Sequence, residues 1–212
     1  LRTIALSPTS DWKAGMASAD ITPTTPILMQ GYANRVAESR GASDRIYAKT
    51  LFIEHAKGDG ALLVTADVCV LRAGFVKKLC ASITEKTGLE RGKIMVNASH
   101  THAGPVLGRD DLFRYKLSPD ERKHIEDFEA HFIQLVTGAA DKAMKSAAPA
   151  HLSWAKGKTN IAANRRRKVD GRMRMSPNPK GYVDRDVPVL RIADPAGNTL
   201  GVLFGCACHC TT

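Results

Sequence analysis

The feature that most constrains the fold is a turn signal, Gly58-Asp59-Gly60, between two strand-like segments. Apolar side chains alternate with polar ones in segment 47–54, and an apolar segment, 61–71, returns after the turn. Glycine beside aspartate favours the tight turns that join antiparallel strands. The sequence therefore predicts a β-hairpin over residues 47–71.

A helix and another strand follow this hairpin. Segment 72–87 has apolar side chains at helical spacing, and Gly88 is well suited to end a helix. A short apolar strand is expected over 93–97. Hairpin, helix and strand in this order predict an α/β fold of mixed β-sheets flanked by helices.

The second half of the chain repeats the same kinds of element. Ser118-Pro119-Asp120-Glu121 is a capping box that predicts a helix to about residue 146. A short strand is expected over 150–155, and a second hairpin pairs strand 187–192 with strand 200–210. Residues 164–186 lack periodicity and are interpreted as a long loop.

Two histidines at the end of strand 93–97 are the first candidates for chemistry. His100 and His102 stand two residues apart before Gly104-Pro105, and side chains two apart on a strand point the same way. Neutral imidazole is a common zinc ligand. A second candidate is His209, which shares a face of strand 200–210 with the small residues Gly205 and Ala207.

Charge and cysteine content are less decisive. The chain of 212 residues has a net charge of +10, concentrated in the loop 165–174. A basic loop of this kind suits contact with an anionic membrane surface. No aromatic residue interleaves with its arginines, so nucleic acid is not an expected partner. Cys206, Cys208 and Cys210 are interpreted as a row of small buried side chains.

Segments along nearly the whole chain match, in order, the motifs of one family. They are residues 14–23, Gly31-Tyr32, 44–49, 99–105, Asn164-Arg165, 184–189 and 207–209. Together these segments resemble the N-terminal catalytic domain of the neutral/alkaline, non-lysosomal ceramidases. The resemblance implies an αββα-type sandwich, incomplete in this chain. Residues 1–212 are then the N-terminal part of a zinc hydrolase domain whose remainder follows Thr212, in the same polypeptide or a separate one.

The resemblance also implies an activity and a set of site residues. The activity is zinc-dependent cleavage, by metal-activated water, of an amide bond in an N-acyl lipid such as ceramide. His100 and His209 correspond to zinc ligands. His102 and Arg165 correspond to catalytic residues that contact substrate or the developing oxyanion, while Gly31, Tyr32 and Asn164 are expected to line the substrate site. Two further ligands and a serine of the family lie beyond this chain, so we expect residues 1–212 alone to bind zinc weakly and to be inactive.

Two other functions remain open at the level of sequence. The same metal chemistry would serve an esterase, a lactonase or another N-acyl amidohydrolase, because activated water attacks any acyl carbon. Alternatively, the chain is a basic, non-enzymatic module that binds anionic lipid or nucleic acid. The chain opens with Leu1-Arg2 instead of Met, from which we expect an upstream segment to have been removed and the protein to be secreted or periplasmic.

Overall fold

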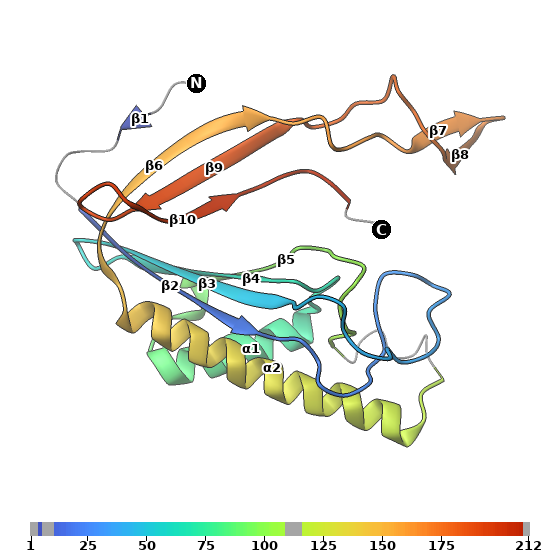
Figure 1. Cartoon of the computed structure of the whole chain (residues 1–212), viewed down its shortest axis with the longest axis horizontal. Coiled ribbons are helices and arrows are strands. Elements are labelled where there is room, and N and C mark those ends of the chain that lie inside the picture. The colour runs from blue at the N-terminus through green and yellow to red at the C-terminus, as the bar shows by residue number, and fades with distance from the viewer. Residues whose placement is uncertain (1–3, 6–10, 109–115, 210–212) are drawn as a thin grey trace. The chain divides into compact units, whose positions relative to one another are not determined.

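The structure, a computed structural model, describes residues 4–5, 11–108 and 116–209. The chain divides into two compact units (Figure 1). Unit 1 comprises residues 1–11 and 149–209, and unit 2 comprises residues 12–148 and 210–212. Each unit is described by itself.

Unit 2 is built on four strands. They are β2 (Trp12–Asp20), β3 (Tyr47–His55), β4 (Gly60–Ala66) and β5 (Ile94–Ala98), adjacent in that order. β2, β3 and β4 pair antiparallel, whereas β4 and β5 run parallel. Gly58 has φ +89° in the turn between β3 and β4, a backbone conformation that glycine adopts without strain. The first predicted hairpin is confirmed.

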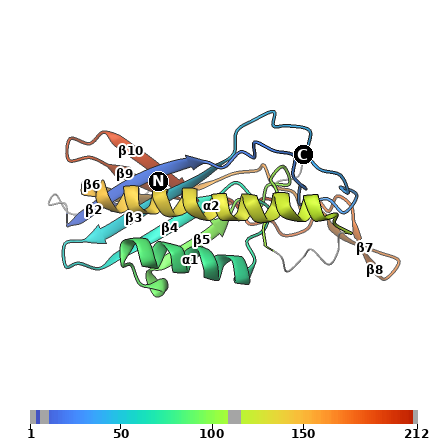
Figure 2. The same cartoon turned by 90° about the horizontal axis from the view of Figure 1, so that it is seen from below.

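Two helices cover one face of this sheet (Figures 1 and 2). α1 (Ala73–Thr87) ends at Gly88, which has φ +74° and closes the helix as predicted. A 3₁₀ turn, η1 (Arg91–Lys93), then leads into β5. α2 (Pro119–Lys145) begins with the predicted capping box, in which the Ser118 hydroxyl accepts a hydrogen bond from the Glu121 N–H at 3.2 Å.

The core of unit 2 lies between the sheet and the helices. Its largest side chains come from both layers, and the set includes Phe52, Leu62, Leu79, Ile83, Ile125 and Phe132. Phe132 of α2 meets Phe75 of α1 edge-on, with ring centroids 5.5 Å apart. Apolar side chains at strand and helix periods thus meet in one layer, as an α/β fold requires.

Unit 1 is an antiparallel sheet. β6 (Ala148–Lys158), β9 (Asp186–Ala193) and β10 (Thr199–Phe204) lie side by side in that order, and β1 (Ile4–Ala5) pairs with β6. The predicted second hairpin corresponds to β9 and β10. β10 is shorter than expected, because it ends at Phe204 instead of continuing to residue 210.

This early end changes the interpretation of the residues beyond Phe204. Residues 205–209 have no strand structure, and the Cys208 N–H donates to the Cys206 carbonyl at 2.9 Å. Strand alternation therefore does not position His209, and the prediction that it shares a strand face with Gly205 was wrong. Cys206 and Cys208 are partly exposed instead of buried, and Cys210 lies outside the described residues.

The segment interpreted as a long loop contains a hairpin. β7 (Arg166–Val169) and β8 (Arg172–Met175) pair antiparallel around Asp170-Gly171. Both turn residues have positive φ, +49° and +76°, as a tight hairpin turn requires. The prediction of a loop over 164–186 was wrong for these two strands. Three successive basic residues hide any alternation in β7, and the Arg-Met alternation of β8 spans only four residues.

Candidate metal centre

The parallel pairing of β4 and β5 creates the site. Ala66 and Ala98 are paired residues at the last position of each strand, so both chains leave the sheet at the same edge. The Ser99 N–H donates to the Ala66 carbonyl at 2.9 Å and holds the two departing segments together. Segment 67–71 and segment 99–105 therefore run close to one another as they leave unit 2's sheet.

His100 lies in the first turn of the second segment. Its φ of +58° is left-handed, a conformation that histidine, asparagine and aspartate adopt more readily than most residues. The Nδ1 atom of His100 lies 2.7 Å from the carbonyl oxygen of Cys69 and 3.8 Å from the Cys69 sulfur. Because a carbonyl only accepts, this hydrogen bond requires the proton on Nδ1, so Nε2 is the nitrogen that carries the lone pair.

His102 is held much more tightly than His100. It is 6% exposed, and its ring meets the rings of Tyr32 and His100 edge-on, with centroids 4.8 and 5.1 Å away. Gly31 has φ +117°, and a Cβ placed there would lie 2.5 Å from Cγ of His102. Only glycine at position 31 lets the chain approach the imidazole so closely.

Arg35 ties these parts together. Its Nη1 atom donates to the Gln30 carbonyl at 3.3 Å and also to the His102 carbonyl, and its guanidinium lies 4.7 Å from the centre of the Tyr32 ring. One arginine thus binds the backbone of two segments, at Gln30 and at His102. The loop after β2 and the loop after β5 are further joined by the Gln30 N–H, which donates to the Gly104 carbonyl at 3.0 Å.

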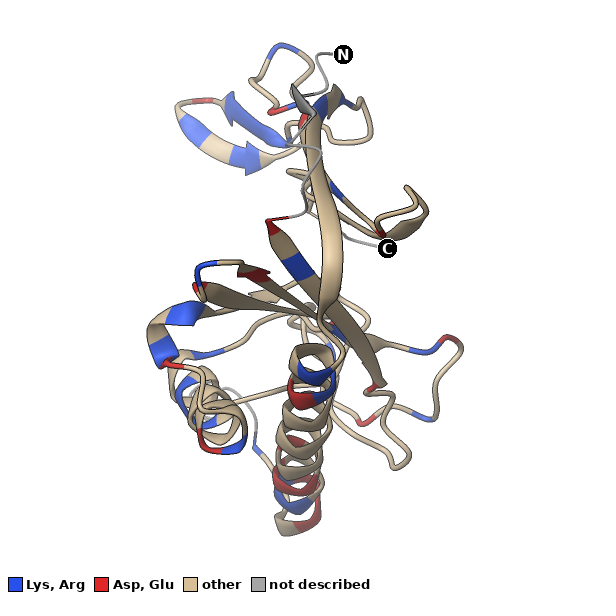
Figure 3. Cartoon of the chain, turned by 90° about the vertical axis from the view of Figure 1, so that its left-hand side faces the viewer, with Lys and Arg blue, Asp and Glu red and all other residues tan. Residues whose placement is uncertain are grey.

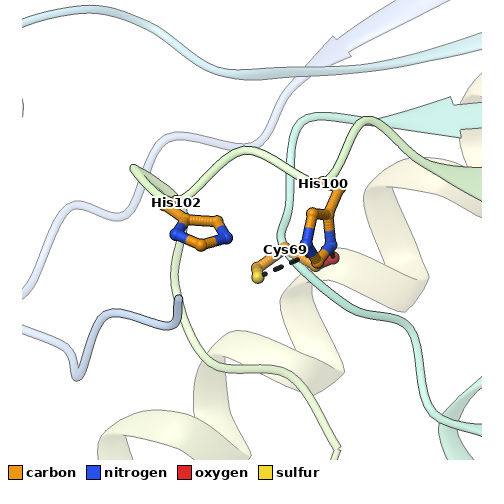
Figure 4. Close-up of side chains that lie close together, drawn as sticks. All are labelled: Cys69, His100 and His102. Atoms are coloured by element: carbon orange, nitrogen blue, oxygen red, sulfur yellow. Dashed lines mark hydrogen bonds between the residues drawn. The ribbon is translucent and has the colours of Figure 1, made fainter. Parts of the chain in front are cut away.

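Three donors in this region have the chemistry of a metal site. The donors belong to Cys69, His100 and His102, and one ligand atom of each residue lies within 4.8 Å of the other two (Figure 4). A tetrahedral zinc site needs separations of about 3.3 to 3.6 Å, so the donors would draw closer around an ion. Imidazole and thiolate are donor types that zinc prefers, and in this chemistry the residues fit a zinc ion. Burial raises the pKa of the Cys69 thiol, and the charges of Arg72 and Arg35 oppose this effect.

A pocket adjoins the histidine segment. It has a volume of about 180 Å³, and its lining includes Thr22, Met29, Asp44, Ala103 and Pro105. Ala103, which follows His102 in the chain, is the lining residue nearest to the histidine pair in sequence. The segment 31–44, interpreted from sequence as surface or cleft wall, supplies one side of it.

The predicted site residues fall into two groups. Gly31, Tyr32, His100 and His102 come together in unit 2. Their proximity comes from loop geometry and not from strand alternation, since β5 ends at Ala98.

The remaining predicted residues, Asn164, Arg165 and His209, belong to unit 1. The Asn164 side chain donates to the Tyr182 carbonyl at 2.9 Å and accepts from the Arg166 N–H at 2.9 Å, so it shapes the base of the β7–β8 hairpin. Arg165 and His209 are exposed. Their places in a site stay predictions.

Sequence reasoning missed Cys69 and Arg35. Cys69 lies in an apolar segment and resembles a core residue in the sequence, where only the parallel pairing of β4 with β5 relates it to His100. Arg35 lies in a polar loop without periodicity. A signal for Cys69 did exist, because the residues that follow two neighbouring parallel strands meet at one edge of the sheet.

Comparisons with known proteins agree on one family. A family model described as "Neutral/alkaline non-lysosomal ceramidase, N-terminal" matches residues 12–212. Neutral ceramidase B of Dictyostelium discoideum is 24% identical over 224 residues, which cover 100% of this chain and 30% of that protein. Neutral ceramidase of Drosophila melanogaster is 29% identical over 97 residues, which cover 44% of this chain and 14% of that protein.

A solved structure has the same fold. A crystal structure of neutral ceramidase from Pseudomonas aeruginosa matches with a TM-score of 0.74 at 20% identity, over 95% of this chain and 34% of that chain. The likeness confirms the α/β fold predicted from the sequence. The chain spans about a third of the solved relative and 30% or less of these two curated relatives.

Proposed function

Because this chain belongs to the neutral/alkaline non-lysosomal ceramidase family, we propose that it is the N-terminal part of a zinc-dependent hydrolase that cleaves the amide bond of an N-acyl lipid such as ceramide. The observation that carries this proposal is the group formed by His100, His102 and Cys69 at the shared edge of β4 and β5. It combines the donor types of a zinc site with the segment that the family resemblance assigns to catalysis.

His100 is the proposed metal ligand of unit 2. Its bond to the Cys69 carbonyl sets the tautomer and the ring orientation, as second-shell partners do in many metal sites. His209 of unit 1 is proposed as a further ligand on the family resemblance alone. A bound zinc ion would polarise the substrate carbonyl and lower the pKa of a water molecule to about 7.

His102 is the proposed proton-transfer residue. Its ring is buried between Tyr32 and His100, and Arg35 holds its backbone, so the imidazole is preorganised beside the metal donors. An amide leaving group must gain a proton before it departs as an amine, and histidine performs this transfer near neutral pH. Arg165 is proposed to stabilise the negative charge that develops on the carbonyl oxygen.

Recognition of the lipid is assigned to the surroundings of these residues. The pocket beside Ala103 is proposed to hold a polar part of the substrate next to the amide, because Thr22, Ser43 and Asp44 line it. Gly31 and Tyr32 lie against the His102 ring, and they are proposed to line the substrate site there. Asn164, whose side chain accepts from the Arg166 N–H, is proposed to line the substrate site beside Arg165.

The β7–β8 hairpin is proposed to contact an anionic membrane surface, where such a substrate resides. Cations occupy most of its positions, as the blue segments of the two short strands in Figure 3 show. The register places Lys168 opposite Met173 and Arg166 opposite Met175, and both methionines are more than 60% exposed. Cations beside exposed apolar side chains suit the boundary between headgroups and acyl chains.

The rest of the domain is the proposed partner of unit 1. Val202 and Phe204 alternate on one side of β10 and are 55% and 66% exposed. Exposed apolar residues on a sheet face indicate a surface that another element covers. Roughly two thirds of the length of these relatives lies outside the part that this chain matches, which is sufficient to supply that element.

In the described ranges, no helix has the length and apolar character needed to cross a bilayer. Secretion or export to the periplasm stays a prediction from the sequence.

The test uses the longer protein that contains this chain. We expect the purified protein to hold zinc by elemental analysis and to release fatty acid from an N-acyl sphingosine. His100→Ala should abolish both properties, whereas His131→Ala, a change at an exposed histidine of α2, should leave both unchanged. A panel of ester and lactone substrates distinguishes the related hydrolases. A protein without metal whose activity survives His100→Ala would contradict the proposal.

A further inference from the structure

We infer that Cys69 binds the metal directly, as a sulfur ligand beside His100. The inference rests on the proposed metal-dependent function and deepens it, because it adds a donor that the family resemblance does not supply. The ligand set of this chain then contains a soft thiolate as well as imidazole.

The first argument is position. Cys69 contacts His100 with two atoms, its carbonyl oxygen at 2.7 Å and its sulfur at 3.8 Å from Nδ1. The sulfur, His100 and His102 all offer donors within 4.8 Å, and Figure 4 shows the sulfur between the two rings. The Nδ1 contacts orient the ring, and the grouping of the donors within 4.8 Å places the sulfur near a metal held by His100.

The second argument is the environment of the thiol. Cys69 is 4% exposed, yet it lies at the sheet edge that carries the histidines and not in the cluster of side chains that forms the core of unit 2. Cys80, by contrast, is fully buried within that core. Cys69 and Cys80 thus differ in their surroundings, because Cys69 lies against the imidazole of His100.

A thiolate ligand has consequences for metal choice. Soft sulfur donors favour soft metals, so a site with Cys69 should prefer Cd²⁺ over a site of nitrogen and oxygen donors alone. Sulfur also donates more charge to the metal than imidazole does. The site should therefore retain zinc in competition with the harder cations Mg²⁺ and Ca²⁺, which prefer oxygen.

The experiment titrates the 212-residue chain with Co²⁺ and records the sulfur-to-cobalt charge-transfer absorption. The band should be present in the wild type and absent in Cys69→Ser, with at least tenfold weaker cobalt binding in the variant. Cys80→Ser is the matched buried control. A triple variant, Cys206→Ser, Cys208→Ser and Cys210→Ser, removes the cysteines that could bind metal elsewhere. The band should survive in both controls.

Three outcomes would overturn the inference. A band that persists in Cys69→Ser, or that disappears in the triple variant, assigns the sulfur to another cysteine. If the wild type binds cobalt through His100 but shows no charge-transfer band, Cys69 is not a metal ligand. The proposed hydrolase function is then unaffected. No cobalt binding by the chain or by the longer protein would reject both. Because the wild type, the triple variant and Cys80→Ser together assign the band, the test does not depend on the folding of Cys69→Ser.

Discussion

At the scale of single residues, Gly31 is the position where the site depends most directly on backbone. A methyl group there would lie 2.5 Å from the His102 ring, in addition to the cost of positive φ. We expect Gly31→Ala to lower the free energy of unfolding by about 2–5 kcal/mol, the sum of left-handed strain and overpacking. The measurement is denaturant unfolding of the chain, combined with the NMR signals of the His102 ring.

Gly58→Ala is the matched control for this substitution. Gly58 also has positive φ, +89°, but a Cβ there would meet nothing within 4 Å. It should cost only about 1–2 kcal/mol, the strain alone, and leave the His102 signals in place. Equal costs for the two variants would show that contact with His102 does not constrain position 31.

Arg35 offers a second prediction at this scale. Arg35→Met removes the donor shared by the Gln30 and His102 carbonyls and the cation over Tyr32. We expect a loss of about 1–3 kcal/mol in stability, because charged hydrogen bonds to backbone are lost, and a shift of the His102 ring signals. Arg40→Met, at an exposed arginine of the same loop, should change neither quantity by a comparable amount.

The sequence anticipated the histidine pair but not the residues that hold it. His100 and His102 are visible as a motif, whereas Gly31 and Tyr32 were expected to line the substrate site on family resemblance alone. Gly31 and the His102 ring are in contact although their loops are 67 or more residues apart in the sequence. No periodicity of the sequence encodes such a contact. Cys69 could have been found only from the parallel pairing of β4 with β5.

At the scale of elements, patterns with strong local chemistry were predicted well. The capping box before α2, Gly88 after α1 and the turn at Gly58 are satisfied by neighbours in sequence, so their signals survive without tertiary information. The β7–β8 hairpin and the end of β10 were missed. In the β7–β8 hairpin, charged side chains lie on both faces. At the end of β10, an alternating run of small residues continues in the sequence beyond the last paired residue of the strand.

The β7–β8 hairpin carries a prediction of its own. Arg167 and Arg174 are directly paired, so replacing both by glutamate changes the charge of one face of the hairpin by four units. Each basic residue near an anionic bilayer contributes about 1 kcal/mol, so the double variant should bind phosphatidylserine vesicles at least about 30-fold more weakly. Co-sedimentation with vesicles at two salt concentrations measures this effect.

The control places the same charge change elsewhere. Lys77 and Lys78 are exposed on α1, and replacing both by glutamate also shifts the net charge by four units. Vesicle binding should fall much less for this variant. Equal losses would indicate that net charge alone draws the protein to the bilayer. Tighter binding of single-stranded RNA than of vesicles would favour nucleic acid as the partner of the hairpin.

At the scale of the whole molecule, the chain has the fold of its family and only part of its length. The match over residues 12–212 confirms the family resemblance read from the motifs, and the fold class follows with it. The contacts that would complete the proposed centre, among them those of His209, stay predictions. These are contacts between distant parts of a polypeptide, which sequence patterns within one segment do not specify.

This leads to a prediction for the isolated chain. Residues 1–212 should fold but fail to hydrolyse N-acyl sphingosine, whereas the longer protein should be active. The reason is that the proposed ligands of this chain leave part of the metal's coordination and the apolar side of β10 for the remaining polypeptide to complete. Turnover by the chain alone, at a rate near that of the longer protein and sensitive to His100→Ala, would contradict this expectation.

The left-handed backbone of His100 has a consequence for anyone who redesigns this centre. A replacement at that position must meet two independent requirements: it must tolerate φ +58°, and it must be able to coordinate a metal ion. Aspartate and asparagine tolerate this φ and retain an oxygen donor. Valine, isoleucine and threonine do not tolerate it, because their Cβ is branched. A library at position 100 should therefore yield folded variants with altered metal preference mainly through aspartate, because it adopts the turn and adds a hard anionic ligand.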